Sequence, residues 1–310
     1  MRVMSEKFAD LGTPHRVWAI AAIHGDRDRL FALHDHLATR FSVGDRLVYL
    51  GNYLGVGSPD NDAVFDELLA FRSALLAKPG MEPTDIVHLR GPIEESWQRL
   101  LRLQFAPVPA QMIDRLLKAG IEPYLRLYGI SLYDTKSMAR ADSVTITRWT
   151  NQLRVAQRLA LGHEPLVCSM RRAAVTGASL PSSQRVLFVP AGFDSSRSLE
   201  DQGDSLWFGE DPLRAKGTSN VPYARIVSGY DSQHGGIHTE GKAVTLDGGC
   251  GFGGPLVCGG FDANGKLMDI ITVGGKGAIE SSSQGDRVHP VSLERRPKPS
   301  YWTEHVAMSA

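Results

Sequence analysis

Apolar residues near the start of the chain fall into a short block that is followed by a stretch with helical spacing. Residues 17–23 form a continuous apolar run that ends in His24 and Gly25. Such a run is typical of a strand that is buried on both faces and stopped by a turn. Residues 26–40 then repeat their leucines at helical spacing. The pattern predicts a strand, a loop and a helix.

The same unit returns further along the chain. Residues 46–50 and 85–89 predict two more strands, and residues 61–76 and a segment from about residue 94 predict two helices. Strands that alternate with helices at this spacing favour a largely parallel sheet covered on both faces.

The middle of the chain is different, because residues 94–176 have helical spacing without intervening strands. We interpret this part as an inserted helical subdomain. Its predicted buried positions are Trp97, Leu100, Leu101, Ile113, Leu116, Leu117, Leu153, Leu159 and Leu161. Strand patterns return afterwards, with many glycines between them, at residues 185–189, 224–227, 243–246, 255–261 and 266–273.

The pattern divides the chain into an N-terminal arm (1–14), one main domain (15–275, with the insertion at about 95–176) and a C-terminal tail (276–310). The arm and the tail are polar and lack periodicity, so we expect them to be poorly ordered or to lie on the surface. The tail is mildly basic. With only Tyr301 and Trp302 to stack on bases, we expect it to be solvated rather than bound to nucleic acid.

Composition excludes several classes of partner. The 310 residues contain 34 Lys plus Arg and 34 Asp plus Glu, so no overall field draws the protein to nucleic acid or to a membrane. The three cysteines form no CxxC pair, which indicates reduced thiols in a cytosolic protein. The first apolar run is much shorter than the roughly 20 residues of a membrane helix. We therefore predict a cytoplasmic protein.

Candidate chemistry lies in the loops that follow the predicted strands, because ligands of open α/β sheets bind beyond the carboxyl ends of the strands. Each of these loops contains glycine. They are AAIHG (21–25), GNYLGVG (51–57), RGPIE (90–94), VPAG (189–192) and VSGY (227–230).

In order and spacing, these loops resemble the motifs of the calcineurin-like metallophosphoesterases. The similarity is greatest to the branch of serine/threonine phosphoprotein phosphatases and bacterial diadenosine tetraphosphatases. That branch has Gly-Asp-X-His-Gly, Gly-Asp-X-X-Asp-Arg-Gly, Arg-Gly-Asn-His-Glu, Val-His-Ala-Gly and a late Gly-His. The resemblance runs from about residue 17 to 273 and includes residues 44–51 and 251–254. It implies an α/β fold, a β-sandwich of mixed sheets flanked by helices, with an inserted helical subdomain.

Most of the family's functional side chains are replaced at the matching positions. His24, Gly25 and Glu94 are kept. The resemblance implies that Ala22 replaces the metal-binding Asp, Asn52 the bridging Asp, Gly55 the second Asp of that loop and Val56 the phosphate-binding Arg. It also implies that Pro92 replaces the Asn ligand and Ile93 the acid His, and that Pro190 and Tyr230 replace the two later His.

These replacements remove what a pair of metal ions requires. A two-metal centre needs carboxylate and imidazole ligands and an anionic oxygen that bridges the cations. Here the vestigial metal positions are His24, a full ligand, and Asn52, which offers only a neutral carbonyl. Ile93 also lacks the proton of a general acid, a loss on the order of 10² to 10⁴ in rate. We expect no cofactor.

We therefore predict a catalytically impaired metallophosphoesterase-fold protein, a pseudophosphatase, with a binding or regulatory role. Its crevice, lined by His24, Asn52, Tyr53, Arg90 and Tyr230, would hold an unidentified protein partner or a phosphorylated ligand. His24 and Glu94 also have simple structural interpretations, as a hydrogen-bonded strand-end histidine and a first-turn helix carboxylate.

Two alternatives stay open. One is a slow or atypical phosphohydrolase that acts on a phosphoprotein or a dinucleoside polyphosphate. In it His24 and Glu94, with Asn52 and one of His234 and His238, would use a single Mn, Fe or Zn ion. The other is a subunit of a larger assembly, with the helical insertion or the tail as its interface.

Overall fold

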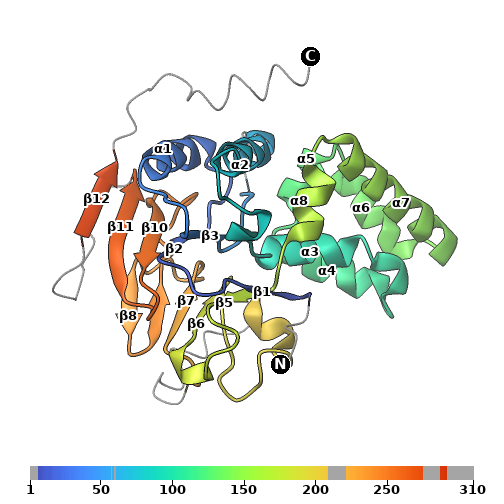
Figure 1. The fold of residues 1–310 in the computed structure, drawn as a ribbon. Coiled ribbons are helices and arrows are strands. Elements are labelled where there is room, and N and C mark those ends of the chain that lie inside the picture. Colours follow the sequence, from blue (N-terminus) through green and yellow to red (C-terminus); the bar gives the residue numbers. More distant parts are fainter. Residues whose placement is uncertain (1–5, 57, 59–60, 209–220, 275–286, 292–310) are drawn as a thin grey trace.

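Two mixed β-sheets packed face to face form the centre of the molecule, with helices on one side and a helical subdomain at one end (Figure 1). The structure is a computed structural model that describes residues 6–56, 58, 61–208, 221–274 and 287–291. This arrangement confirms the predicted fold class. In the described ranges, no helix combines the length and the apolar character that crossing a membrane would require.

The first sheet has the strand order β12-β11-β10-β2-β3-β4. The neighbours β2, β3 and β4 are parallel, as the repeated strand–helix unit predicted, whereas β10 pairs antiparallel with both β2 and β11. The strands are β2 (Val17–Ile20), β3 (Arg46–Tyr49), β4 (Ile86–His88), β10 (Leu256–Phe261), β11 (Leu267–Val273) and β12 (Arg287–Val291).

The second sheet has the order β1-β5-β6-β7-β9-β8, in which β6, β7 and β9 are parallel neighbours. The strands are β1 (Phe8–Asp10), β5 (Ala173–Val175), β6 (Val186–Val189), β7 (Arg225–Ser228), β8 (His238–Glu240) and β9 (Ala243–Thr245). Apolar side chains of both sheets, including Val17, Val48, Phe188 and Val227, form the core between them.

Helices α1 (Arg27–Ala38) and α2 (Asn61–Leu76) cover the outer face of the first sheet (Figure 1). The Asp26 carboxylate begins α1 by accepting a hydrogen bond from the Arg29 backbone N–H at 3.0 Å, as an N-cap residue does. The leucines predicted from helical spacing, Leu30, Leu33 and Leu37, are fully buried against the sheet.

The predicted helical insertion is present and shares a core with α2. Its helices are α3 (Pro92–Leu100), α4 (Pro109–Lys118), α5 (Glu122–Leu127), α6 (Leu132–Ser137), α7 (Ser143–Leu159) and α8 (His163–Ser169). The short 3₁₀ helices of the chain are η1 (Pro83–Asp85), η2 (Leu103–Phe105), η3 (Met138–Arg140), η4 (Ser182–Gln184) and η5 (Gly203–Leu206). Trp97 of α3 is fully buried and donates a hydrogen bond to Gln157 of α7 at 2.6 Å.

Several predictions about burial and strands were wrong. Leu159 and Leu161 are 82% and 79% exposed, because Leu159 is the last residue of α7 and Leu161 lies in the turn before α8. The segments of β1, β5 and β8 were not predicted as strands, because β5 lies inside the stretch that was assigned helical spacing and β1 and β8 contain no continuous apolar run. Their hydrogen bonds come from neighbouring strands that are distant in sequence or, for β8, from β9.

The arm and the tail each contain a strand. In the predicted N-terminal arm, β1 pairs with β5 and Phe8 is buried. In the predicted tail, β12 extends the first sheet beside β11. The other tail residues that were singled out, Tyr301 and Trp302, lie outside the described residues.

Candidate functional site

The loops that follow β2, β3, β4 and β7 meet at one edge of the two sheets. The backbone N–H of His24 donates to the Asn52 carbonyl at 2.9 Å, and that of Ala22 donates to the Gly229 carbonyl at 3.0 Å. A Cβ atom on Gly51 would lie 2.5 Å from the Gly91 backbone nitrogen. The glycines in these loops therefore allow backbone segments to approach where side chains would collide.

Two of the loops contain residues with left-handed backbone. The φ angles of His24 and Asn52 are 49° and 54°, values that non-glycine residues adopt infrequently. Gly55 packs against the His24 backbone and leaves no room for a side chain, because a Cβ atom at Gly55 would lie 1.9 Å from the His24 carbonyl oxygen. Such backbone persists only where the surrounding contacts hold it, and the hydrogen bonds between the loops supply those contacts.

The Glu94 carboxylate is fully buried and joins two of these loops, the one after β3 and the one after β4. It accepts hydrogen bonds from the backbone N–H groups of Asn52 (2.8 Å), Tyr53 (3.1 Å) and Gly91 (2.9 Å). The Tyr124 hydroxyl donates to it at 3.4 Å. Burial raises the pKa of Glu94, and the backbone donors oppose that shift. We call this group of residues the Glu94 node.

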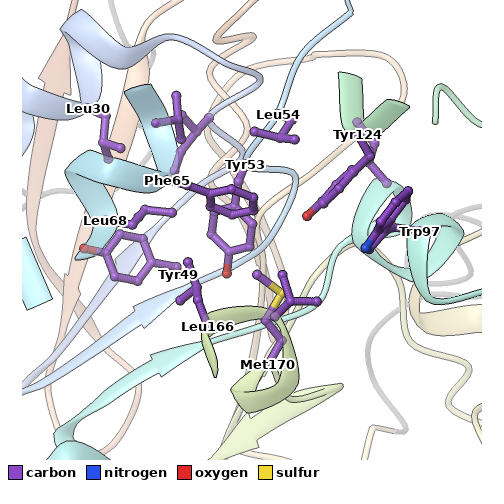
Figure 2. Close-up of a cluster of buried hydrophobic side chains, with 14 of the residues drawn as sticks. Leu30, Tyr49, Tyr53, Leu54, Phe65, Leu68, Trp97, Tyr124, Leu166 and Met170 are labelled. Carbon is purple, nitrogen blue, oxygen red and sulfur yellow. The ribbon is translucent and has the colours of Figure 1, made fainter. Parts of the chain in front are cut away.

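The sequence suggested that Tyr53 lines a crevice, but the structure places its side chain in the core. Its side chain is fully buried, and its hydroxyl donates to the Leu89 carbonyl oxygen at 2.7 Å. Figure 2 shows its ring among the core side chains, beside Tyr49 and Phe65. Burial, followed by the charge of Glu94, raises its pKa well above the ordinary value. Tyr53 is therefore a core residue that follows the strand-end turn.

Arg90 lies on the α3 side of the edge. Its guanidinium forms an ion pair with Glu95 at 3.2 Å and lies 5.9 Å from the centre of the Trp207 ring. The Trp207 indole N–H also donates to the Arg90 carbonyl at 2.5 Å. Arg90 is thus fixed to α3 and to the segment after η5.

Four aromatic rings meet on the β7 and β10 side of the edge, and we call them the ring cluster: His24, Tyr230, His234 and Phe252. The ring centre of His24 is 5.0 Å from that of Phe252, 5.6 Å from that of Tyr230 and 6.2 Å from that of His234. His234 stacks on Phe252 at 4.2 Å. The structure therefore brings together three of the residues singled out from the sequence, His24, Tyr230 and His234.

His24 has an unsatisfied polar atom in this cluster. The residue is 7% exposed, and its buried Nε2 atom has no hydrogen-bond partner in the part of the chain that the structure describes. Burial, and then the nearby His234, lower the pKa of His24 from 6.5 to about 4. The imidazole is therefore neutral at physiological pH and offers a free lone pair or N–H.

Asp247 orients His234 within the ring cluster. Its buried carboxylate lies 2.9 Å from His234 Nδ1 and accepts backbone hydrogen bonds from Asp231 (2.9 Å) and Gly249 (2.8 Å). Burial raises the pKa of Asp247, and these donors oppose the shift. His238, the other histidine of the pair noted in the sequence, instead lies on β8 with its Nδ1 3.0 Å from the Gly236 carbonyl oxygen.

Sequence reasoning missed Asp247 and Phe252. Both lie in the glycine-rich run after β9, which had been assigned only to strand turns. One signal was available: Phe252 is a large apolar residue among glycines, and it is 63% exposed.

The donor groups at this edge do not fit a binuclear metal centre. Ala22 and Pro92 have hydrocarbon where the resemblance implies ligands, and Asn52 Oδ1 accepts from the Ile93 backbone N–H at 3.4 Å. The Glu94 oxygens are already bonded to backbone donors. In the described ranges, no group of three His, Cys, Asp or Glu side chains is placed to hold a metal ion.

Comparison with known proteins gives matches in structure only. No protein-family model matches the chain, and no curated protein matches its sequence. Among solved structures, the chain is similar to a candidate diadenosine tetraphosphatase, with 18% identity, a TM-score of 0.47, and coverage of 88% of this chain and 99% of that one.

Two further structures are similar at lower TM-scores. A protein serine/threonine phosphatase from Saccharomyces cerevisiae, with similarity to human phosphatase PP5, has 14% identity and a TM-score of 0.41. The match covers 81% of this chain and 76% of that one. A cold-active protein-tyrosine phosphatase from a psychrophilic Shewanella species has 16% identity and a TM-score of 0.41, with 88% and 85% covered. The chain is therefore similar to solved phosphatase structures over most of its length.

Proposed function

We propose that this protein has a metallophosphoesterase fold without a working binuclear centre, and that it acts by binding in a regulatory role. The observation that carries the proposal is the Glu94 node. The carboxylate that the resemblance retains accepts hydrogen bonds from three backbone N–H groups. Its oxygens hold the two loops together.

The chemistry of the neighbouring positions supports the same proposal. Two cations at close distance need anionic ligands to neutralise their charge, and Ala22, Asn52 and Pro92 supply none. Ile93, at the position of the general acid, has no proton to give to a leaving group. These deficits concern metal binding and proton transfer separately, so restoring one would not restore hydrolysis.

The ring cluster is the part of the edge best suited to contact a ligand. It combines an exposed ring, Phe252, with the unpaired Nε2 of His24. We infer that a protein partner or a phosphorylated ligand binds at this edge, and that the protein acts in the cytoplasm. The balanced overall charge of the chain gives no preference for nucleic acid or membrane surfaces.

One observation favours the alternative of a slow, single-metal phosphohydrolase. Because the Asp247 carboxylate holds His234 through Nδ1, the Nε2 lone pair of His234 is free, which is the arrangement of many metal-binding histidines. His24 Nε2 is also unpaired. A single Mn, Fe or Zn ion would take its imidazole ligands from these two residues. A phosphoprotein or a dinucleoside polyphosphate would be the substrate that the resemblance implies.

Metal content and turnover of the purified protein separate the two proposals. We would measure bound metal, and hydrolysis of an aryl phosphate and of diadenosine tetraphosphate with added manganese, for the wild type, His24→Ala and His238→Ala. His238 is a matched control because it is a histidine on β8. We expect no stoichiometric metal and no turnover in any of the three proteins. Stoichiometric metal, with turnover that only His24→Ala abolishes, would overturn the binding proposal.

A further inference from the structure

Two arginines lie against the Trp207 ring, and three more act electrostatically on the groups beside it; we call the five the arginine cluster. Arg90 and Arg172 lie with their guanidinium carbons 5.9 and 5.4 Å from the centre of the Trp207 ring. In Figure 1 the segment around η5, which precedes Trp207, lies near α3 and β1. The cluster consists of Arg90 after β4, Arg99 of α3, Arg102 after α3, Arg115 of α4 and Arg172 before β5.

The members of the arginine cluster act on one another and on Asp204 electrostatically. Burial lowers the pKa of Arg90, and Arg172 and Arg102 lower it further. The pKa of Asp204 is lowered first by its hydrogen bonds from Arg99, and also by the charges of Arg172 and Arg115. Arg172 and Arg102 therefore act on Arg90, and Arg99, Arg172 and Arg115 act on Asp204, so that Arg172 links the two groups.

Positive charge exceeds negative charge in this cluster. Glu95 pairs with Arg90 (3.2 Å) and Arg99 (2.9 Å), and Asp204 pairs with Arg99 at 2.5 Å. Among the described residues that these contacts join, five cations face three carboxylates when the buried Glu94 is counted as charged. The Nε atoms of Arg90 and Arg172 are buried and have no hydrogen-bond partner within the described ranges. An unpaired N–H of a charged group favours an additional acceptor.

We propose that the arginine cluster binds a phosphate monoester group, and that the Asp204 carboxylate fills its place when no such ligand is bound. This inference rests on the proposed binding function and names the chemistry of its ligand. The Asp204 side chain is 65% exposed, and both its oxygens accept hydrogen bonds from Arg99, at 3.2 and 2.5 Å. An incoming anion displaces it without disturbing the core.

A phosphate group fits this cluster better than a carboxylate does. Guanidinium groups bind phosphate oxygens through paired, charge-assisted hydrogen bonds. A phosphate monoester carries close to two negative charges near neutral pH, whereas Asp204 supplies one. Phe208, which is 41% exposed with the Arg99 guanidinium 5.1 Å from its ring centre, offers an apolar contact for the group that carries the phosphate.

Calorimetric titration with a phosphoserine peptide, and with the same peptide unphosphorylated, tests the proposal at low ionic strength. The variants are Arg102→Gln and Arg115→Gln, whose side chains are exposed and whose loss leaves the core intact. We expect the wild type to bind only the phosphorylated peptide. Each arginine variant should bind about three- to tenfold more weakly. Arg126→Gln, an exposed arginine of α5 that pairs with Glu122, is the matched control and should bind as the wild type does.

Removing Asp204 should change the affinity in the opposite direction. Asp204→Asn takes away the competing carboxylate, so we expect about three- to tenfold tighter binding of the phosphorylated peptide. Asp201→Asn removes the same charge from an exposed position nearby that pairs with Ser198, and it should have a smaller effect. A melting curve of each variant confirms that it is folded.

Two arms of the experiment identify the source of the phosphate and decide the proposal. If inorganic phosphate binds as tightly as the peptide, with the same dependence on Arg102 and Arg115, the cluster is a phosphate site whose ligand is the free ion. Absence of wild-type binding, equal affinity in all variants, or weaker binding by Asp204→Asn would overturn the proposal. The titrations contain a chelator and do not measure turnover, so their failure leaves the absence of a binuclear centre untouched.

Discussion

The two sides of the strand-end edge satisfy their polar groups in opposite ways. At the Glu94 node, a fully buried carboxylate accepts hydrogen bonds from three backbone N–H groups of two loops. In the ring cluster, the buried Nε2 of His24 has no partner in the described ranges, and the neighbouring Phe252 ring is 63% exposed. Of two retained motif residues, Glu94 is therefore structural, whereas His24 stays available to a ligand beside Phe252, a residue that had been given no functional role.

The same comparison separates stability from function. Buried polar groups that are fully bonded hold a structure together, and their loss is costly. A buried polar group without a hydrogen-bond partner costs free energy, so its presence in a folded protein needs an explanation. Ligand binding is one such explanation, which makes these groups candidates for binding. We therefore expect substitutions at the Glu94 node to act on folding and substitutions in the ring cluster to act on protonation and binding.

The largest expected effect is that of Glu94→Ala. The substitution leaves the backbone N–H groups of Asn52, Tyr53 and Gly91 without their acceptor. We expect the free energy of unfolding to fall by more than about 3 kcal/mol, as measured by urea denaturation at pH 7.

Glu122→Ala is the control for this prediction, because it removes a carboxylate whose ion pair with Arg126 lies on the surface. It should cost less than about 1 kcal/mol. If Glu94→Ala were as stable as this control, the Glu94 node would not hold the loops together.

The second effect is a pH dependence that belongs to His24. Its pKa is about 4 in the folded protein and 6.5 as a reference, so between these values the unfolded chain binds a proton that the folded chain does not. Stability is therefore fully present above pH 6.5 and falls as the pH drops toward 4. The contribution is about 3 kcal/mol over that window.

His24→Asn isolates this contribution, because asparagine tolerates the left-handed backbone of the position. Urea denaturation at several pH values should show a shallower acid loss for the variant than for the wild type. Burial also lowers the pKa values of His34, His88 and His163. These three histidines are present in both proteins, so their contributions to the loss of stability in acid are the same. Identical slopes would contradict the assignment of a low pKa to His24.

The smallest effect on stability is expected for Phe252→Ala. Because the side chain is 63% exposed, the free energy of unfolding should change by less than about 0.5 kcal/mol. The substitution opens the His24 ring to water, so the pKa of His24 should rise from about 4 toward 6.5. An NMR titration of the His24 ring measures the shift. Phe105→Ala, an exposed phenylalanine of η2, should leave the His24 pKa unchanged.

Much of the fold follows from the sequence because apolar periodicity reports burial directly. The continuous runs at residues 17–23 and 46–50 predicted β2 and β3, and the helical spacing predicted α1 and α2. The strands β1, β5 and β8 could not be predicted in this way. The equally short β4 and β9 belong to apolar runs, whereas β1 and β8 contain polar residues and β5 lies in a stretch with helical spacing, so tertiary pairing defines these three.

The site was predictable only in part, for a physical reason. Motif order placed His24, Asn52 and Tyr230 in the strand-end loops, because chain direction fixes where a parallel strand ends. It could not reveal that Tyr53 turns into the core to bond the Leu89 carbonyl. Nor could it reveal that Glu94 is saturated by backbone donors, since such contacts depend on the loop geometry.

The central claim is that this edge does not hold two metal ions, and anomalous diffraction from crystals grown with manganese tests it most directly. We expect no pair of manganese peaks between His24 and Asn52. Two peaks about 3.5–4 Å apart, bridged by the Asn52 side chain, would contradict it.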